Sequence, residues 1–261
     1  MALLAQLFIF MELLLMLQKS LIKAMQLIDV MAGEQNDYGV TEIASKLQIN
    51  KSNAHDILST FEHLGYVRRD PDSRRYSLDY KFLTIAQKIA NRLSFQEVAR
   101  KQVSLISNEV QEICYFGVPY GDKILYLEGG FPSENFSTKP VLGMTAPLYC
   151  TGLGKAVLAH LPKEEQDAIC NGPLKQITEN TITTAKDLLD ELERIKLRGY
   201  SIDNMEHEFG IKCVAVAVFD KNGKVRGGLS ITGPSLRFPN KRIEELALLL
   251  KSAADTISGS F

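Results

Sequence analysis

Four polar side chains with hydrogen-bonding chemistry, Lys51, Ser52, Asn53 and His55, open a helix that we expect over residues 51–64. Lysine and asparagine can donate hydrogen bonds to guanine or adenine edges, and serine can reach bases or phosphate oxygens. Such side chains in the first turns of a helix are typical of one that enters the major groove of DNA. The alternative, for any one of them taken alone, is a solvated polar helix face.

A helix-turn-helix is predicted around this polar run. Residues 20–31 carry apolar side chains at helical spacing, and Thr41 can cap a short helix over 42–47. Residues 48–50 form a three-residue turn, from which Asn50 can cap the next helix. Two short helices joined by so tight a turn form a helix-turn-helix, and the polar run lies on its second helix.

Two pairs of arginines follow this helix, Arg68 with Arg69 and Arg74 with Arg75, and they flank an Asp-Pro-Asp-Ser turn at 70–73. The pattern predicts strand, turn and strand. Arginine pairs are usually solvated surface. A hairpin directly after a recognition helix, however, is the wing of a winged helix, whose arginines can contact phosphate or the minor groove.

Charge and composition leave this interpretation open. The chain has 261 residues and a formal net charge of −1, from 30 basic and 31 acidic side chains, so it carries no overall basic excess. Residues 17–92 hold 11 basic against 9 acidic side chains, whereas residues 93–261 hold 19 against 21. The four cysteines form no CxxC pair, which argues against a zinc ribbon or a redox dithiol. Buried thiols in a reducing cytoplasm are expected instead.

A second stretch with chemical potential is Thr-Gly-Leu-Gly-Lys-Ala at 151–156, which opens a helix after a strand. Glycines there let a ligand approach the backbone, and free N–H groups favour an anion. The stretch is not a P-loop, because Tyr149 and Ala156 stand where that motif needs glycine and a hydroxyl residue. Plain packing of helix on strand is the alternative.

The remaining pattern predicts a mixed α+β domain. A linker helix is expected over 80–93, followed by a further helix to about 112. The expected elements after it are strands over 113–118, 123–128 and near 142–149, helices over 151–161, 163–170 and 185–198, strands over 211–219 and 224–232, and a final helix over 240–258.

The first 16 residues form an apolar leader that we expect to be helical. Its leucines and Phe10 follow alternating steps of four and three, which suits pairing with a second copy. The run lacks the basic start of a signal peptide and is shorter than a membrane span. Helix pairing, an upstream extension before a start at Met11 or Met16, and a membrane tether are the alternatives, and we expect no membrane contact.

The motifs resemble the IclR family of bacterial transcriptional regulators from about residue 17 to 261. The first domain contributes KSNAH at 51–55 and GYV at 65–67. The second contributes GMTAPLYCTGLGKAVLA at 143–159, TIT at 181–183, RGYSID at 198–203, EHEFGIKCVAV at 206–216 and LSITGP at 229–234. Two features depart from the family pattern: Asp56 stands where the family often has arginine, and the leader is longer than usual.

The resemblance implies a winged helix-turn-helix domain at 17–79, a linker helix at 80–93 and a GAF-like α+β effector-binding domain at 94–261. It further implies a cytoplasmic homodimer or homotetramer that binds operator DNA and represses or activates a catabolic operon in response to a small organic acid, without a cofactor or metal. By matching position, the effector site would comprise Gly152, Leu153, Asp203, Cys213, Ser230 and Thr232, with an apolar wall of Met144, Ala146, Leu148 and Ile211.

An enzyme on the second domain is the competing hypothesis. Cys150, Cys213, His160 and His207 are the candidate nucleophiles and bases. Cys213 lies inside an apolar strand, which suits an inert buried thiol better than a nucleophile. We therefore expect a regulator and not an enzyme.

Overall fold

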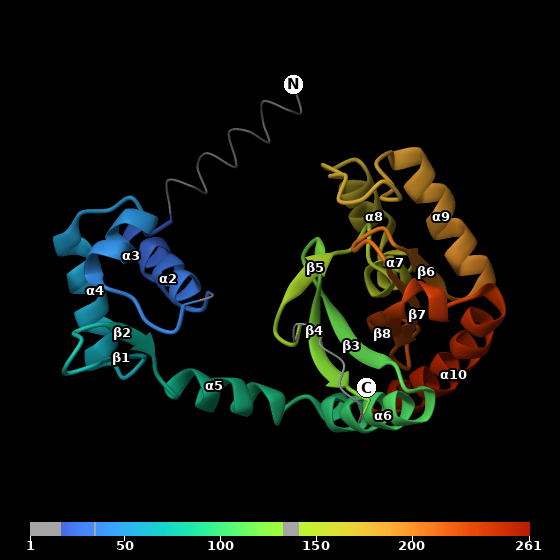
Figure 1. The fold of residues 1–261 in the computed structure, drawn as a ribbon, viewed down its shortest axis with the longest axis horizontal. Helices are drawn as coiled ribbons and strands as arrows, with labels where there is room; N and C mark the ends of the chain where they lie inside the picture. Colours follow the sequence, from blue (N-terminus) through green and yellow to red (C-terminus); the bar gives the residue numbers. More distant parts are fainter. Residues whose placement is uncertain (1–16, 34, 133–140) are drawn as a thin grey trace. The chain divides into compact units, whose positions relative to one another are not determined.

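The computed structural model describes residues 17–33, 35–132 and 141–261, and the expectations for the leader at 1–16 lie outside this part of the chain. The chain divides between Arg92 and Leu93 into two compact units. Figure 1 shows a small helical unit with a two-stranded hairpin and a larger unit built around one sheet. Each unit is described by itself.

The first unit is a winged helix-turn-helix. Its elements are α2 (Lys19–Met31), α3 (Val40–Lys46), α4 (Lys51–His63), β1 (Val67–Arg69), β2 (Tyr76–Leu78) and α5 (Lys81–Ala90). One apolar cluster unites them, with Leu27, Ile43, Leu58 and Tyr76 fully buried. The predicted helices and hairpin are confirmed, and Gln48, at a φ of 51°, makes the sharp turn between α3 and α4.

Of the two predicted helix caps, Thr41 is wrong and Asn50 is confirmed in position only. Helix α3 begins at Val40, so Thr41 lies inside it, and Gly39 is the capping position. The carboxylate of Glu42 accepts the N–H of Gly39 at 2.9 Å and thereby caps the helix from within. Asn50 does precede α4, but its side chain makes no capping hydrogen bond.

Backbone pairing attaches the wing to the helices. Strands β1 and β2 are antiparallel, and the turn between them is closed by Asp70, whose Oδ1 accepts from the N–H groups of Asp72 and Ser73. Tyr76 also pairs with Tyr38, the two residues exchanging N–H···O bonds of 2.8 and 2.9 Å. The hairpin is therefore tied to the segment that leads into α3.

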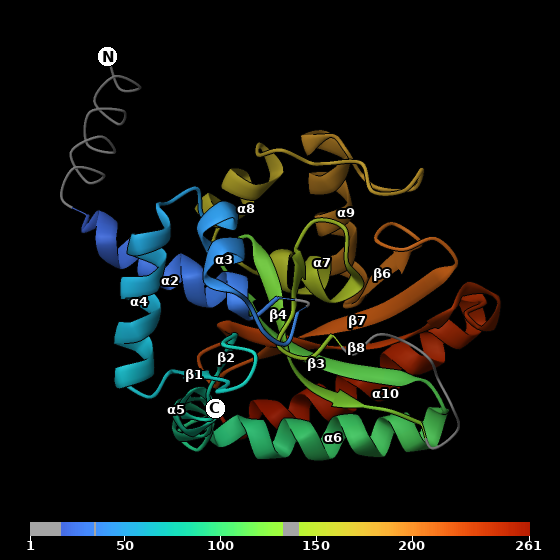
Figure 2. The ribbon, with the colours of Figure 1, turned by 60° about the vertical axis from the view of Figure 1, so that its left-hand side comes forward.

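The second unit is an antiparallel six-stranded sheet with helices on both faces, in strand order β5-β4-β3-β8-β7-β6. The strands are β3 (Ile113–Tyr120), β4 (Lys123–Gly130), β5 (Thr145–Pro147), β6 (Ser201–Asn204), β7 (Ile211–Phe219) and β8 (Val225–Pro234). The helices are α6 (Ser94–Val110), α7 (Gly152–Leu158), α8 (Lys163–Cys170), α9 (Ala185–Arg198), the short 3₁₀ turn η1 (Ser235–Arg237) and α10 (Asn240–Ser258). In Figure 2, α6 and α10 lie on one side of the sheet and α7, α8 and α9 on the other.

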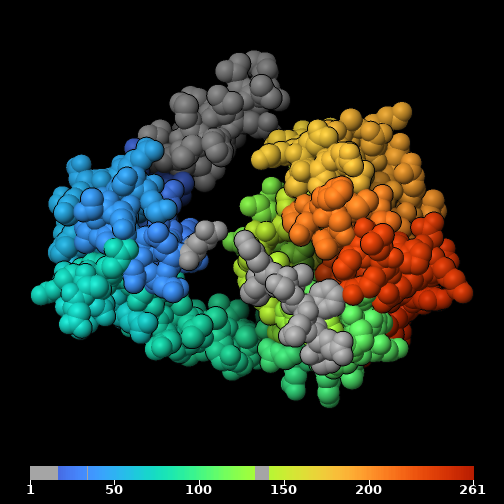
Figure 3. All heavy atoms as spheres, viewed as in Figure 1, coloured from blue at the N-terminus to red at the C-terminus, as the bar shows by residue number. Residues whose placement is uncertain are grey.

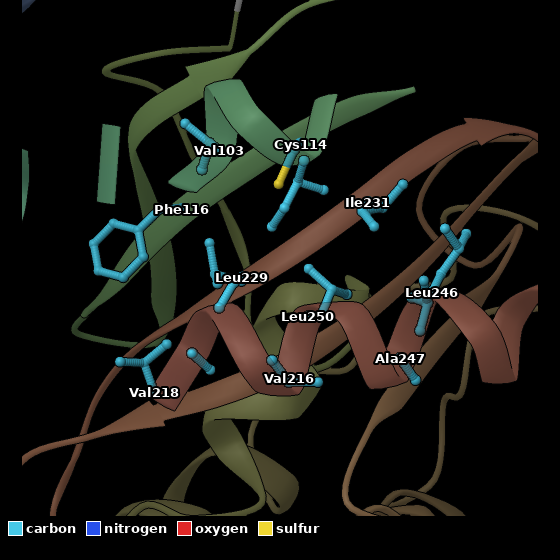
Figure 4. Close-up of a cluster of buried hydrophobic side chains, with 14 of the residues drawn as sticks. Val103, Cys114, Phe116, Val216, Val218, Leu229, Ile231, Leu246, Ala247 and Leu250 are labelled. Carbon is cyan, nitrogen blue, oxygen red and sulfur yellow. The ribbon is translucent and has the colours of Figure 1, made fainter. Parts of the chain in front are cut away.

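Side-chain alternation along the strands assigns residues to the two faces. Val214, Val216 and Val218 of β7 belong to the apolar cluster of α6 and α10, which Figure 4 shows between helix and sheet. Cys213 and Ala215 belong to the cluster that faces α7. The face toward α7 therefore receives the odd-numbered positions at the start of β7, among them a predicted site residue.

Strands β3, β4 and β8 each end two residues later than expected, α5 ends three residues earlier, and three further elements also differ. Strand β6 was not predicted, because its four residues mix polar and apolar types and follow directly on α9. Strand β5 is confined to Thr145–Pro147, shorter than the expected 142–149. Helix α7 ends at Leu158, earlier than the expected 161.

Helix α6 packs so closely on β4 that position 130 accepts only glycine. A methyl group at Gly130 would overlap the backbone carbonyl of Val103 and lie 2.9 Å from Cβ of Ser107. Gly130→Ala is expected to lower the free energy of unfolding by about 1–3 kcal/mol through overpacking, measured by urea denaturation. Ser104→Ala on the exposed side of α6 is the control, and equal stability of the two variants would contradict the close packing.

Candidate functional site

The polar run of α4 faces solvent. Ala54 and Leu58 are fully buried in the core of the first unit, while Lys51, Ser52, Asn53 and His55 are all exposed. Asp56 is exposed as well, with its Oδ1 3.9 Å from Nδ1 of His55. The first two turns of α4 thus present hydrogen-bonding groups outward, as the groove-reading helix of a helix-turn-helix must.

Three wing arginines extend from the hairpin, which is part of the surface of the first unit (teal in Figure 3). The Nε of Arg68 donates to Oγ of Ser77 at 2.9 Å, and its guanidinium lies 5.5 Å from the ring centre of Tyr80. The guanidinium of Arg69 lies over the ring of Tyr76 at 5.3 Å. Arg74 is exposed, and its side chain has no hydrogen bond or ion pair to the described residues.

Arg75 is engaged within the unit. Its Nε donates to Oδ1 of Asp37 at 2.5 Å, and its two terminal nitrogens donate to the carboxylate oxygens of Glu42 at 3.3 and 2.7 Å. Hydrogen bonds to Asp37 and then to Glu42 raise the pKa of Arg75, while the Gly39 N–H and Arg75 lower the pKa of Glu42. Arg75 therefore joins the wing to the first turn of α3.

The predicted effector residues of the sheet lie on three neighbouring strands. Asp203 of β6 pairs with Cys213 of β7, which in turn pairs with Thr232 of β8. Ser230 lies two residues before Thr232 and pairs with Ala215. Asp203, Cys213 and Ser230 are buried and Thr232 is half-buried, so four side chains of the predicted set form one polar patch.

The start of α7 closes over this patch. A methyl group at Gly152 would lie 2.8 Å from Sγ of Cys213 and 3.5 Å from Cβ of Asp203, so only glycine lets the helix come this close. The N–H of Leu153 faces the sulfur of Cys213, and the Ser201 hydroxyl donates to the carbonyl of Gly152. Gly152 thus packs against Cys213 and Asp203, and Leu153 contacts Cys213.

The predicted apolar wall is only partly assembled. Ala146, Leu148 and Leu153 are buried in the cluster that contains Cys213. Met144, directly before the start of β5, is 56% exposed, and Ile211 is half-buried at the start of β7, opposite Pro234. The structure therefore joins Ala146 and Leu148 to the polar patch but leaves Met144 at the surface.

Burial dominates the electrostatics of the patch. Asp203 is 6% exposed, and removal from water raises its pKa to about 7, although its Oδ1 accepts the Glu206 N–H at 2.7 Å. Burial likewise raises the pKa of Cys150 to about 12 and that of Cys213 further still. These thiols stay protonated at neutral pH, which disfavours the nucleophile of the enzyme hypothesis.

A buried ion pair beside Asp203 was not predicted. Nζ of Lys155 lies 2.5 Å from Oε1 of Glu206, and the two residues are 1% and 5% exposed. The second oxygen, Oε2 of Glu206, is buried and has no hydrogen-bond partner among the described residues. A sequence signal existed, since Lys155 is the one charged residue in a run from Gly152 to Leu158 that is otherwise small or apolar.

A separate cavity of about 570 Å³ lies elsewhere on this unit. Its walls come from the β3–β4 turn, the end of β5, α8 and the loop after it, and include Lys123, Tyr149, Ile169 and Lys175. None of the ten predicted effector residues lines it. Among the described residues, no helix is long and apolar enough to cross a membrane, and no group of three potential metal ligands occurs.

A winged helix-turn-helix unit joined to an α+β unit with a buried polar site defines a DNA-binding regulator with a sensing domain. Comparison with protein families agrees: residues 20–71 match the IclR helix-turn-helix domain, and residues 87–259 match the bacterial transcriptional regulator IclR C-terminal domain. The chain belongs to the IclR family of transcriptional regulators.

Known relatives extend over nearly the whole chain. The HTH-type transcriptional regulator KdgR of Escherichia coli is 34% identical over 87% of this chain and 86% of its own length. The crystal structure of the Thermotoga maritima IclR protein is also 34% identical, with a TM-score of 0.76 over 92% of this chain and 97% of that one. An IclR homologue from Microbacterium hydrocarbonoxydans, complexed with 4-hydroxybenzoate, shares the fold at 20% identity, with a TM-score of 0.82 over 93% and 98% of the two chains.

Removing one partner of the buried ion pair is expected to destabilise the second unit. In Lys155→Met the Glu206 carboxyl stays buried without its counter-charge, and loss of a buried partner typically costs about 3–5 kcal/mol. The double variant Lys155→Met with Glu206→Gln carries no uncompensated charge, so it should recover part of that loss in urea denaturation. Equal losses in the single and double variants would show that the two charges are not coupled.

The exposed pair of Lys163 and Asp167, with N and O 2.9 Å apart, is the matched control. Lys163→Met removes the same ammonium group at a solvated position, where water replaces the partner. No comparable loss is expected from it.

Proposed function

We propose that this IclR-family regulator controls a catabolic operon in the cytoplasm by binding a small organic acid beside Asp203 and Cys213. The observation that supports the proposal best is the contact of Gly152 with both residues. This contact brings the backbone at the start of α7, the Asp203 carboxyl and the Cys213 thiol together in the interior of the second unit. Ser230 and Thr232 would orient the ligand through their hydroxyls, and Ala146, Leu148 and Leu153 would contact its apolar part.

The 4-hydroxybenzoate complex of the Microbacterium homologue supports this class of ligand. That ligand joins a carboxylate to an apolar ring and a hydroxyl, a combination that a buried site with polar and apolar walls can hold. For this chain, small carboxylates with an apolar or hydroxylated body are therefore the first candidates.

For DNA, the proposal divides the first unit into base-reading and phosphate-binding groups. Lys51, Ser52, Asn53 and His55 would meet base edges from α4, and Arg68, Arg69 and Arg74 would contact phosphate or the minor groove from the wing. Arg75 holds two carboxylates of its own unit, so the role that its contacts support is to position the wing rather than to bind phosphate.

A homodimer or homotetramer on a two-fold symmetric operator completes the proposal. Helix α5 supports it, because none of its residues is buried and Leu83 and Ile89 are 65% and 56% exposed. Effector binding would shift the populations of two assemblies that present their recognition helices at different spacings.

The division of labour among the arginines can be tested on DNA. Arg74→Ala is expected to weaken binding to the promoter fragment next to the gene and to random DNA by a similar factor, and to flatten the dependence on salt, because one phosphate contact is lost. Thermal stability should not change. Fluorescence anisotropy at several salt concentrations measures both effects, and an unchanged salt slope would remove Arg74 from the interface.

Arg75→Ala is the contrasting variant. Because it releases Asp37 and Glu42, it is expected to lower the melting temperature of the first unit along with DNA binding. A specific loss of DNA affinity at unchanged stability would return Arg75 to the set of phosphate contacts. A protein that binds its neighbouring promoter no better than random DNA would contradict the proposed operator.

A thermal-shift screen of small carboxylates tests the effector. A ligand that binds the native state raises the apparent melting temperature by mass action, and the ligand found should also change operator affinity. Gly152→Ala is expected to abolish the shift, since its methyl group would stand 2.8 Å from Sγ of Cys213. Response to neutral ligands alone would contradict the acid, and turnover of a ligand would revive the enzyme hypothesis.

A further inference from the structure

The polar patch around Asp203 contains more buried carboxyl groups than buried ammonium groups. Asp203 and Glu206 are 6% and 5% exposed, and Lys155, at 1%, is the buried cation beside them. The groups that act electrostatically on Asp203 come from each neighbouring element: Glu206 of the β6–β7 loop, Lys155 of α7, Cys150 before α7, Cys213 of β7 and Tyr126 of β4. With both carboxyls ionised, this buried site already carries a net negative charge.

The single ammonium is committed to Glu206. Nζ of Lys155 lies 2.5 Å from Oε1 of Glu206, which also accepts the N–H of Asn204 at 3.3 Å. Asp203 forms no ion pair with any residue that the structure describes; its Oδ1 accepts the N–H of Glu206, and the N–H of His207 contributes a second backbone hydrogen bond. The two carboxyls therefore differ, and Asp203 is the one without a counter-charge.

An anionic ligand at Gly152 and Cys213 would meet Asp203 at close range. Gly152 packs against both Cys213 and Asp203, since a Cβ at position 152 would be 2.8 Å from Sγ of Cys213 and 3.5 Å from Cβ of Asp203. A ligand that binds beside these residues therefore lies next to this carboxyl. One ammonium would then face three carboxylates in a site removed from water, which is strongly unfavourable. A proton on Asp203 turns one of these carboxylates into a hydrogen-bond donor that a ligand carboxylate accepts.

We propose that Asp203 takes up a proton when the effector binds, so that the site accepts a small carboxylate only together with one proton, and that Lys155 and Glu206 act as positioning residues. The inference rests on the acid effector proposed above. It specifies the ligand class as an anion that accepts a hydrogen bond from Asp203, as opposed to a hydroxyl ligand that donates one.

The burial of Asp203 supports this assignment, because a carboxyl with a pKa near 7 is protonated at little energetic expense at physiological pH. The direction of the pH dependence of ligand affinity follows from this pKa. Below that pKa the free site already holds the proton, so affinity for a carboxylate is constant. Above it, binding must draw a proton from solution, so affinity falls as pH rises, by up to about tenfold per pH unit.

Apart from the carboxyls, the titratable groups beside Asp203 are not expected to change their protonation between pH 6.5 and 8.5. The thiols of Cys150 and Cys213 and the phenol of Tyr126 have pKa values raised by burial and remain protonated at pH 8.5. Burial lowers the pKa of His207 from its ordinary value of 6.5, which favours the neutral imidazole over this range. Proton uptake between pH 6.5 and 8.5 therefore reports on the carboxyls.

Isothermal titration calorimetry of the full chain tests the proposal with acetate, lactate, benzoate and 4-hydroxybenzoate as probes. The strongest binder is titrated at pH 8 in phosphate and in Tris, whose ionisation enthalpies differ, and the difference in heat gives the number of protons taken up. About one proton is expected, with affinity at pH 8.5 at least about tenfold weaker than at pH 6.5.

Asp203→Asn replaces the carboxyl by a neutral group of the same shape. Affinity in this variant should vary less than twofold over the same pH range, whereas Asp190→Asn, on the exposed side of α9, should retain the wild-type profile. If Asp203→Asn fails to fold, Asp203→Ser is the second variant, because it also removes the titrating carboxyl and should give an equally flat pH profile.

The outcomes separate this inference from the proposed function. A carboxylate that binds without proton uptake, or an Asp203→Asn variant with the wild-type pH profile, overturns the proton on Asp203 and leaves the acid effector standing. Binding of none of the probes at pH 6.5, where the site is protonated, overturns both.

Discussion

The close contact between α7 and the sheet is the constraint on which the second unit depends. All seven residues of this helix are buried, because β6, β7 and β8 lie beneath it and α9 packs beside it. Contact at this distance requires Gly152 over Cys213 and Gly154 over Leu148. A helix so enclosed has no solvated side for a charged residue, so Lys155 must find its partner inside the protein and does so in Glu206.

The fold could be predicted in outline because local patterns and packing agree. Helices α9 and α10 and strand β7 have the boundaries that periodicity predicts, since each presents an apolar face to the core, and α8 also matches although its buried side consists of Gln166 and Cys170. Strand β6 escaped prediction because Ser201 and Asp203 are polar yet buried, a pattern that only the tertiary environment explains. The Thr41 cap was wrong because the helix begins one residue earlier, at Val40, where Glu42 accepts the N–H of Gly39.

The candidate site, like the fold, could be predicted only in part from the sequence. Its residue types and their positions came from a family resemblance, but their mutual contact depends on strand register, which a linear pattern does not contain. Sequence spacing treats Arg74 and Arg75 alike, although the side chain of Arg74 is exposed with no partner in the described part of the chain and Arg75 binds Asp37 and Glu42. Likewise, the ion pair of Lys155 and Glu206 joins residues 51 positions apart.

Helix α5 has a consequence for how the two units could communicate. It is ten residues long and none of its residues is buried, while Phe82, at its start, packs on the ring of Tyr66 at 5.3 Å. Isolated helices shorter than about 12–15 residues are marginal in water. The order of this linker is therefore not fixed by its own sequence but is conferred by whatever surface covers Leu83 and Ile89. A helix of this length and exposure is marginally stable by itself, so a change in what packs on Leu83 and Ile89 would change how ordered the linker is.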